Sequence, residues 1–345
     1  MRPGPLGPEF EGPVFAHGFS LRKRAYVRGF ADRQDVRFVR RGQAVAAGAH
    51  LLLWGSAPLP LGLAPSVRTV RVEDGFVRSV GLGADLTRPL SWVFDDQGIY
   101  YDATQESAIE NLLQQTQFGS AEIARAQALR ERIVQAGLTK YNLAPRRWQR
   151  PATNRKVVLV AGQVETDASI ARGALDIRGN LALLQAVRAA RPEAWLVYKP
   201  HPDVVAGLRG AGAGEAQAGQ YCDQVVIDAS MHDLLLQVDE VHVLTSLTGF
   251  EALLRGKPVV CWGHPFYAGW GLTEDRQPHP RRTRRLTLDE LVAGALLRYA
   301  VYLSRVTERR CTPEQAMDEL LQWRARQPNP ERWWRRWLRP FIARP

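Results

Sequence analysis

The sequence predicts an α/β protein made of two consecutive βα domains with a cleft between them. Short, continuously apolar runs bounded by turn residues are typical of strands buried on both faces of a parallel sheet, and Val157–Ala161 is one of them. Amphipathic stretches such as Ala121–Ala136 alternate with these runs, as helices and strands do in α/β proteins. A polar, proline-containing stretch at 145–156 without apolar periodicity predicts the linker between the domains.

The predicted first domain covers residues 14–150. It follows a proline- and glycine-rich N-terminus, residues 1–13, that we expect to be disordered. A basic segment, Leu21–Arg28, follows its first apolar run. The first run, Val14–Ser20, is followed by strands that we expect near Val36–Val39, His50–Trp54, Ser66–Val72 and Leu90–Phe94. We expect helices that begin within Thr104–Ile109 and cover Ala121–Ala136, with Gly137 ending the second helix.

The predicted second domain covers residues 151–320 and repeats strand and helix regularly. We expect strands at 157–161, 194–198, Val225–Ile227, Val241–Leu244 and Val259–Trp262, the last of these being the last clear strand, and helices at Asn180–Ala190, Asp233–Val238 and Gly249–Leu254. Residues 321–345 are predicted to form a C-terminal helix rich in basic and aromatic side chains.

The chain carries a formal charge of +11, from 46 Lys and Arg against 35 Asp and Glu. The positive electrostatic potential of such a chain favours anionic partners, which include nucleic acid, phosphorylated or carboxylated substrates and an anionic membrane surface. The sequence holds no RNP-like, helix-turn-helix or zinc pattern, so we do not expect nucleic acid to be the partner. A basic surface without a specific role is the alternative to all of these.

The cysteines and the apolar runs indicate the cellular compartment in which we expect the protein. The three cysteines are far apart and show no metal-binding spacing, which predicts a reduced, cytoplasmic protein without a structural metal. The first residues lack a charged region followed by an apolar core, so we expect no signal peptide. No apolar run reaches the ~18–20 residues that a membrane span needs, which predicts a soluble or peripheral protein.

Two carboxylate pairs follow predicted strands, one in each domain. Glu165 and Asp167 come after Val157–Ala161, and Glu73 and Asp74 follow the strand that ends near residue 72. In open α/β sheets, ligands bind at the carboxyl ends of strands. Two carboxylates that face one cleft are what glycosyl chemistry uses, one as nucleophile and one as acid/base. Each pair is equally suited to cap a helix or to pair with an arginine, so the spacing leaves both interpretations open.

Two further motifs follow strands of the second domain. Lys199 and His201 stand in a Lys-Pro-His-Pro sequence, in which the flanking prolines fix the backbone direction of His201. A Lys and a His presented at a strand end can bind or neutralise a phosphate leaving group. Ser246 and Thr248 lie where a strand turns into a helix, and hydroxyls with unpaired N–H groups bind phosphate there. A plain helix N-cap is the alternative for these hydroxyls.

Four segments of the chain carry rare strings in a definite order. They are EDGFVRSVGLGADL at Glu73–Leu86, GQVETDAS at Gly162–Ser169, YKPHPDV at Tyr198–Val204 and TSLTGFEALLRGKPVVCWGHPFYAGWGLTED at Thr245–Asp275. These strings resemble the capsular polysaccharide β-Kdo transferases of the KpsC type, and the resemblance covers about residues 70–275. Enzymes of this type are retaining glycosyltransferases that use CMP-Kdo. They build the oligo-Kdo linker on a phosphatidylglycerol-type lipid anchor of Gram-negative capsules.

The resemblance implies a GT-B-like fold, with two Rossmann-like domains on either side of an interdomain cleft and the nucleotide held mainly by the C-terminal domain. It implies that Lys199 and His201 hold the CMP phosphate and that Ser246 and Thr248 complete the cradle. Glu251 would accept hydrogen bonds from the ribose hydroxyls. The donor-binding set also includes residues of the GQVETDAS string and one arginine of the first domain: Gly162, Gln163 and Arg78.

The resemblance also implies a mechanism. Retention at the anomeric carbon is explained by a covalent intermediate and two inversions, and the family parallel puts the nucleophile on Asp167. Glu73 or Asp74 would be the acid/base that deprotonates the acceptor hydroxyl. Arg78 and Arg172 are candidates for holding the Kdo carboxylate bidentately, with a surface arginine as the alternative for each. We expect no cofactor and no divalent metal, because the CMP leaving group carries a single phosphate.

The implied partners are a CMP-sugar donor, a lipid-linked oligosaccharide acceptor, the anionic inner-membrane surface and other capsule-assembly proteins. The implied location is cytoplasmic and peripheral at the inner membrane. Trp333, Trp334 and Trp337 lie among arginines near the C-terminus, and this mixture suits an anionic membrane interface. The alternative is that this segment packs back across the N-terminal domain.

Three matters stay open at this point. Family members often carry two such modules, one for each of two alternating linkages, whereas this chain holds one, so the linkage is not fixed. A sialyltransferase-like enzyme with another CMP-ulosonic acid as donor is the first alternative function. An inactive scaffold module of a capsule-assembly complex is the second, although a dead module would be expected to lack Asp167 or His201, and both are present.

Overall fold

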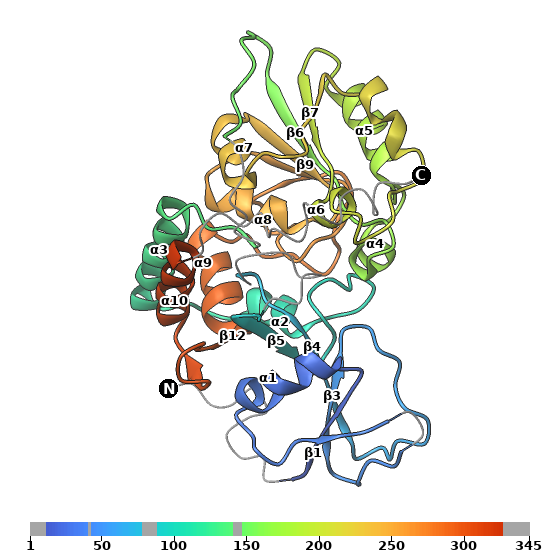
Figure 1. Cartoon of the computed structure of the whole chain (residues 1–345), viewed down its shortest axis with the longest axis vertical. Coiled ribbons are helices and arrows are strands. Elements are labelled where there is room, and N and C mark those ends of the chain that lie inside the picture. The colour runs from blue at the N-terminus through green and yellow to red at the C-terminus, as the bar shows by residue number, and fades with distance from the viewer. Residues whose placement is uncertain (1–11, 41–42, 78–87, 141–146, 327–345) are drawn as a thin grey trace. The chain divides into compact units, whose positions relative to one another are not determined.

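The structure is a computed structural model that describes residues 12–40, 43–77, 88–140 and 147–326 (Figure 1). The chain divides into two compact units. The described part of the first unit lies within residues 12–77, 88–132 and 286–320. That of the second lies within residues 133–285 and 321–326. Each unit contains its own β-sheet, and the combination of one mixed and one parallel sheet with helices confirms the α/β class.

The sheet of the first unit has seven strands in the order β13-β12-β5-β4-β3-β1-β2. Strands β2, β1, β3 and β4 are parallel to one another, whereas β5, β12 and β13 are each added antiparallel to the preceding strand. The strands are β1 (Val14–His17), β2 (Arg37–Phe38), β3 (His50–Trp54), β4 (Arg68–Asp74), β5 (Ser91–Asp95), β12 (Ala300–Leu303) and β13 (Arg310–Cys311).

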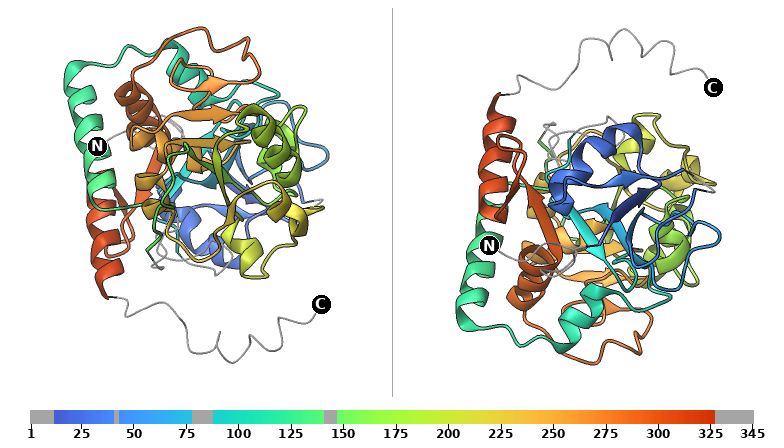
Figure 2. Two further views of the ribbon diagram at one scale, coloured as in Figure 1. Left: turned by 90° about the horizontal axis from the view of Figure 1, so that it is seen from above. Right: turned by 90° about the horizontal axis from the view of Figure 1, so that it is seen from below.

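Aromatic side chains form the centre of the first unit's core. Trp92 of β5 is fully buried, stacks on Phe30 with ring centroids 4.3 Å apart, and meets Trp54 edge-on at 5.2 Å. The helices are α1 (Leu21–Ala31), α2 (Ala108–Gln115), α3 (Ser120–Gln135), α9 (Leu288–Val292), the π-helix η2 (Ala293–Tyr299) and α10 (Pro313–Arg326). Arg125 of α3 and Glu314 of α10 form an ion pair of 2.8 Å, and both views of Figure 2 show these two helices along the same side.

The sheet of the second unit has six strands, all parallel, in the order β11-β10-β9-β6-β7-β8. Numbered along the unit, this is the order 3-2-1-4-5-6 of a Rossmann fold, read from β8 to β11. The order reverses between β6 and β9, and ligands bind at such a switch point, outside the carboxyl ends of the strands. The strands are β6 (Val157–Ala161), β7 (Trp195–Lys199), β8 (Gln224–Val225), β9 (Glu240–Val243), β10 (Val259–Cys261) and β11 (Glu274–Asp275).

Helices cover both faces of this parallel sheet (Figure 1). On one face α5 (Asn180–Ala190) buries Leu183, Leu184 and Val187 against apolar side chains of β6 and β7. On the other face lies α8 (Leu247–Leu254), which contacts β9 and β10. The remaining helices are α4 (Ala168–Gly173), α6 (Pro202–Val205), the 3₁₀-helix η1 (Glu215–Gln220) and α7 (Met231–Gln237).

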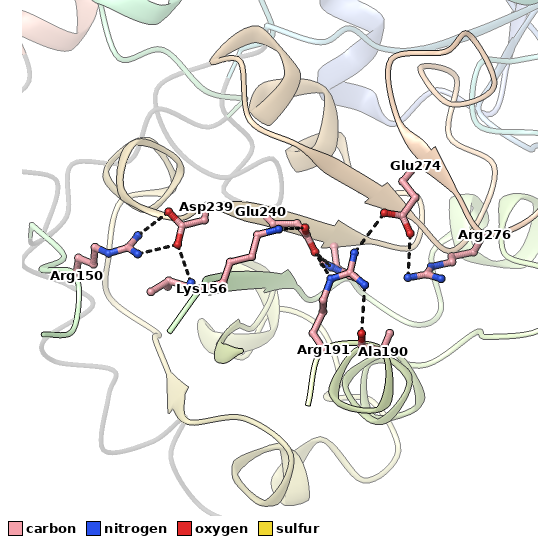
Figure 3. Close-up of polar contacts among 10 residues, drawn as sticks. Arg150, Lys156, Ala190, Arg191, Asp239, Glu240, Glu274 and Arg276 are labelled. Atoms are coloured by element: carbon pink, nitrogen blue, oxygen red, sulfur yellow. Dashed lines mark hydrogen bonds and ion pairs between the residues drawn. The ribbon is translucent and has the colours of Figure 1, made fainter. Parts of the chain in front are cut away.

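Ion pairs tie together the amino ends of the second unit's strands (Figure 3). Glu240, the first residue of β9, is 3% exposed and accepts from Lys156 at 2.5 Å and from Arg191 at 2.9 Å. The buried His242 ring lies 2.6 Å from the same carboxylate, and its other nitrogen accepts from the Trp262 indole N–H. The neutral tautomer of His242 therefore donates to Glu240.

The structure departs from the predicted elements in several places. The observed units differ from the ranges 14–150 and 151–320, because residues 286–320 belong to the first unit. There β12 pairs with β5, and the Tyr299 hydroxyl donates to the buried Asp95 at 2.7 Å. The prediction that Val259–Trp262 is the last clear strand is wrong, since β11, β12 and β13 follow it. The basic segment Leu21–Arg28 is helical and belongs to α1.

Two predicted segments partly lie outside the described residues. Of the expected linker at 145–156, the described residues belong to the second unit, where Trp148 is buried and Arg150 pairs with Asp239 at 2.7 Å. The last described helix, α10, begins at Pro313, well before residue 321, and the tryptophan-containing segment that follows it is outside the described residues. None of the helices in the described part of the chain is long and apolar enough to cross a membrane.

Candidate active site at the carboxyl edge of the second unit

Gln163 joins the two loops at the switch point of the second sheet. Its side-chain nitrogen donates to the Thr245 hydroxyl at 3.0 Å, and its side-chain oxygen accepts from the Thr245 N–H at 2.9 Å. Its main chain is held in turn by the Asn180 side chain through two hydrogen bonds of 2.9 Å. Gln163, predicted to bind the donor, therefore positions the loops after β6 and β9 relative to each other.

Ser246 and Thr248 stand at the start of α8, as predicted. The Ser246 hydroxyl accepts from the Thr248 N–H at 3.3 Å, which makes Ser246 the N-cap. The Tyr267 hydroxyl donates to the Ser246 carbonyl and packs against Gly249, where an added Cβ would lie 2.2 Å from the Tyr267 oxygen. This close packing explains the glycine and holds the first turn of α8 at the sheet edge.

Lys199 ends β7 beside the end of β6. The Gly162 N–H donates to the Lys199 carbonyl at 2.9 Å, and a Cβ on Gly162 would lie 2.6 Å from the Tyr198 hydroxyl, so the glycine at this position serves close packing. The Lys199 side chain is 7% exposed. Burial lowers the pKa of its ammonium to about 8, against a smaller opposing effect of Asp228. A buried ammonium at a strand end is poised to bind an anion.

His201 follows two residues later, as the N-cap of α6. Its Nδ1 accepts from the Asp203 N–H at 3.2 Å, which puts the proton of the neutral ring on Nε2. Burial first, and then the charges of Lys140, Arg209 and Lys199, lower the pKa of His201 to about 4. The ring is therefore neutral near pH 7, with three cations near enough to lower its pKa and the Asp203 carboxylate 3.9 Å from its Nδ1. The Nε2–H and these cations suit a phosphate.

Lys140 and Arg209 have no strand-end or motif signal in the sequence. Lys140 follows α3, and Arg209 lies in the loop after α6, so both reach His201 only through the fold. Glu251 of α8 is 7% exposed and accepts from the Lys140 N–H at 2.6 Å. Burial raises the pKa of Glu251, while Arg255 and Lys140 lower it. Glu251, predicted to hold a ribose, therefore anchors the backbone at Lys140.

The two acids after β6 have different surroundings. The Glu165 carboxylate accepts from the Asn180 N–H at 2.6 Å and from the Ala213 N–H at 3.1 Å, so it caps α5 and ties down the glycine-rich loop. Asp167 is the N-cap of α4, but its exposed side chain makes no capping hydrogen bond. Of the pair, Asp167 alone keeps its carboxylate available for a ligand. The predicted Kdo partner Arg172 lies in the last turn of α4.

The second predicted carboxylate pair lies in the first unit, where Glu73 and Asp74 end β4. Adjacent residues of a strand point to opposite faces, so the two carboxylates cannot share one site. Glu73 accepts from the Asp74 N–H at 2.9 Å, and its other oxygen lies 3.0 Å from where a Gly55 Cβ would be. Gly55 directly follows β3 and has a φ of +55°. One oxygen of Asp74 is buried.

Arg78, predicted to bind the donor, is outside the described residues.

A family model described as "Capsule polysaccharide biosynthesis protein" matches residues 63–310. The chain belongs to this family. It is 41% identical over 331 residues to the capsule polysaccharide modification protein LipA of Neisseria meningitidis serogroup B, and 44% identical over 244 residues to the lipopolysaccharide-processing protein LpsZ of Rhizobium meliloti. These alignments cover 93% and 69% of this chain. The chain spans about half the length of these relatives, 47% and 55% respectively.

Two solved structures are similar to this family member over most of its length. One is KpsC, β-Kdo 2,7 transferase, of Thermosulfurimonas dismutans, at a TM-score of 0.75 and 38% identity, covering 90% of this chain and 99% of that one. The other is KpsC, β-Kdo 2,4 transferase, of the same organism, at 0.78 and 29%, covering 91% and 99%. The resemblance to KpsC-type proteins predicted from the sequence is therefore confirmed.

Proposed function

We propose that this protein is a retaining glycosyltransferase of GT-B-like arrangement that transfers β-Kdo from CMP-β-Kdo to a Kdo-terminated glycolipid during synthesis of a capsular polysaccharide linker. The observation that carries the proposal is the placement of the buried Lys199, the Nε2–H of His201 and the start of α8 at the carboxyl edge of a Rossmann-ordered sheet. The similarity to the KpsC β-Kdo transferases supports the choice of donor. No cofactor is part of the proposal, because CMP-Kdo is a substrate.

The CMP phosphate would lie between the strand-end cations and the start of α8. Lys199 supplies a charge, the Nε2–H of His201 donates a hydrogen bond, and the N-terminus of α8 adds backbone N–H groups beside Ser246 and Thr248. These groups stabilise the phosphate as it departs with the C2–O electron pair. They act without reorganising, because the neighbouring hydrogen bonds already hold His201 and the first turn of α8.

Asp167 is the proposed nucleophile. Its carboxylate attacks C2 of the Kdo residue, CMP leaves, and a glycosyl–enzyme ester forms with inversion. The acceptor hydroxyl then attacks C2 from the opposite side as a base removes its proton, which releases Asp167 and restores the original configuration. We favour Glu73 over Asp74 as this base, because Glu73 faces Gly55 at the end of β3, whereas one oxygen of Asp74 is buried.

CMP binding tests the phosphate site directly. His201→Ala is expected to weaken CMP binding about ten- to a hundredfold, the effect of losing a hydrogen bond to a charged group. His17→Ala in the first unit is the matched control and should bind CMP as the wild type does. Calorimetric titration measures both, with the melting temperature as a check on folding. Equal affinity for wild type and His201→Ala would contradict the site.

The pH dependence of CMP binding tests Lys199. The pKa of its buried ammonium is lowered to about 8, so the charge that attracts the phosphate is present below that pH and is lost as the pH rises through it. CMP affinity is therefore expected to fall between pH 7 and pH 9. Lys199→Met should bind CMP more weakly at pH 7 and show no further loss up to pH 9. Parallel pH profiles of the two proteins would show that Lys199 is not the titrating group.

We propose the 2,7 linkage rather than the 2,4 linkage for the product. The chain is 38% identical to the 2,7 transferase and 29% identical to the 2,4 transferase. The TM-score is slightly higher for the 2,4 transferase, 0.78 against 0.75, but this difference is too small to favour either linkage. We give weight to identity because side chains, rather than the backbone path, select the acceptor hydroxyl. Nuclear magnetic resonance of the product should show substitution at O7, and substitution at O4 would contradict this assignment.

The alternative donor is another CMP-ulosonic acid. The phosphate cradle would serve any CMP-sugar equally, since it contacts only the shared nucleotide. A competition series with CMP-Kdo and CMP-sialic acid separates the two functions, because only the true donor supports transfer. An inactive scaffold would bind CMP but transfer neither sugar.

A further inference from the structure

Three large apolar side chains are unusually exposed at one edge of the first unit. Leu21 at the start of α1 is 82% exposed, and Leu59 and Leu61 in the loop after β3 are 53% and 92% exposed. Strands β1 and β3 are parallel neighbours, so the segments that follow them emerge at the same edge of the sheet. Single exposed leucines are common, but adjacent segments that expose several of them mark an interaction surface.

Direct contacts join these two segments. A Cβ on Gly18, which has a φ of +82°, would lie 3.0 Å from the Ala57 Cβ. The Lys23 ammonium lies 3.1 Å from the ring centroid of Trp54, the last residue of β3. Phe19 packs edge-on against the same Trp54 ring at 5.3 Å. The start of α1 and the loop after β3 are therefore one continuous surface, which we call the leucine rim and define as residues 18–24 and 55–66.

The charges of the leucine rim have one sign. The sequence contains no Asp or Glu from Gly12 to Ala31, whereas Arg22, Lys23 and Arg24 follow one another at the start of α1. The first turn of α1 has no acidic residue. Cations in this position oppose the helix dipole, so helix stability does not explain them. Arg22 is exposed and forms no ion pair with any described residue.

The loop of the leucine rim is apolar and stiff. Residues 55–66, GSAPLPLGLAPS, contain no charged side chain and three prolines, each of which fixes its backbone φ. Leu63 and the buried Pro60 anchor the loop, with Leu63 packed on the core, whereas Leu59 and Leu61 face solvent. The loop therefore holds these two leucines outward instead of letting them collapse onto the protein.

We infer that the leucine rim docks on an anionic phospholipid membrane. Leucines that insert at the acyl boundary beside cations that meet lipid phosphates are the recognised combination for interfacial binding. A protein partner is less well matched, because the three successive cations Arg22, Lys23 and Arg24 would need a dedicated acidic patch on that partner. The rim also adjoins Glu73 through Gly55. If Glu73 is the proposed base, docking here brings a lipid-anchored acceptor to the edge at which it is deprotonated.

Flotation of the full chain with vesicles tests the inference without any transfer reaction. The protein should bind vesicles that contain phosphatidylglycerol, bind phosphatidylcholine vesicles far less, and lose affinity as salt rises. Leu59→Ser/Leu61→Ser should weaken binding at least about tenfold, the effect of removing a buried leucine. Arg22→Glu should weaken binding to the anionic vesicles about tenfold. Leu236→Ser on α7, where the leucine is 49% exposed, is the matched control and should bind as the wild type.

Two results would overturn the inference. One is binding of Leu59→Ser/Leu61→Ser that equals the wild type, as expected if the segment around Trp333 alone holds the membrane or if the rim binds a protein. The other is binding of Arg22→Glu that equals the wild type. Failure of the proposed function is separate, since it would appear as a lack of transfer from CMP-Kdo to a soluble, lipid-free acceptor. The leucine variant should use that soluble acceptor normally and lose transfer only to an acceptor embedded in vesicles.

Discussion

Asp167→Ala is expected to lower the rate of Kdo transfer by about four orders of magnitude or more, the scale on which enzymes lose activity with their nucleophile. CMP binding should be unchanged, because Lys199, His201 and the start of α8 provide the phosphate contacts. Folding should also be unaffected, since the Asp167 side chain is exposed and makes no capping hydrogen bond.

The matched control for this substitution is Asp176→Ala. Asp176 is another exposed carboxylate of the same unit, 2.7 Å from the side-chain nitrogen of Gln277, and has no part in the proposed site. Initial rates with CMP-Kdo and a Kdo-terminated glycolipid compare the three proteins. An Asp167→Ala variant as active as Asp176→Ala would exclude Asp167 as the nucleophile.

Glu240→Ala is expected to destabilise the protein by about 2 kcal/mol, because it leaves the buried His242 N–H without its acceptor and removes the buried carboxylate that Lys156 and Arg191 share. Burial raises the pKa of Glu240, but hydrogen bonds from His242, Lys156 and Arg191 outweigh burial and hold it well below 4.5. A depressed carboxyl pKa contributes stability above the ordinary pKa and loses it as the pH falls. The wild type should therefore lose this contribution progressively below about pH 4.5, whereas Glu240→Ala should lose less.

Glu274→Ala is the control for the same network. Glu274 pairs with Arg191 at 3.3 Å and with Arg276 at 3.0 Å, but its side chain is 50% exposed, so the loss should stay below about 1 kcal/mol. Urea unfolding at pH 7 and at pH 4 measures the free energy of unfolding for each protein. Equal losses for the two variants would show that burial does not strengthen the Glu240 pairs.

Local sequence signals predicted several strands and helices well. Strands β3 and β6 and helix α5 have the predicted bounds, because long apolar runs and a regular helical period leave few alternatives. The short strands β12 and β13 were not predicted, because β12 pairs with the distant β5 and β13 pairs with β12, and such pairing is a tertiary effect. The pairing of β12 with β5 also places residues 286–320 in the first unit, and no local sequence pattern predicts this.

The candidate site was predictable where strand ends meet known motifs and unpredictable where loops converge. His201 and Ser246 follow directly from strand-end chemistry. Lys140 and Arg209 approach His201 from separate loops, so their sequence positions carry no signal. The roles of Glu165 and Glu251 also needed the fold, because a carboxylate that accepts from backbone N–H groups cannot be distinguished in the sequence from one that binds a ligand.

The most direct test of the covalent mechanism is the intact mass of the protein after brief exposure to CMP-Kdo without acceptor. A nucleophilic Asp167 predicts a mass increase of one Kdo residue, located by peptide mapping to the peptide that contains Asp167, and its loss when a Kdo-terminated acceptor is added. An adduct on another side chain, or transfer that proceeds with no adduct at all at any time, would contradict the proposed covalent mechanism.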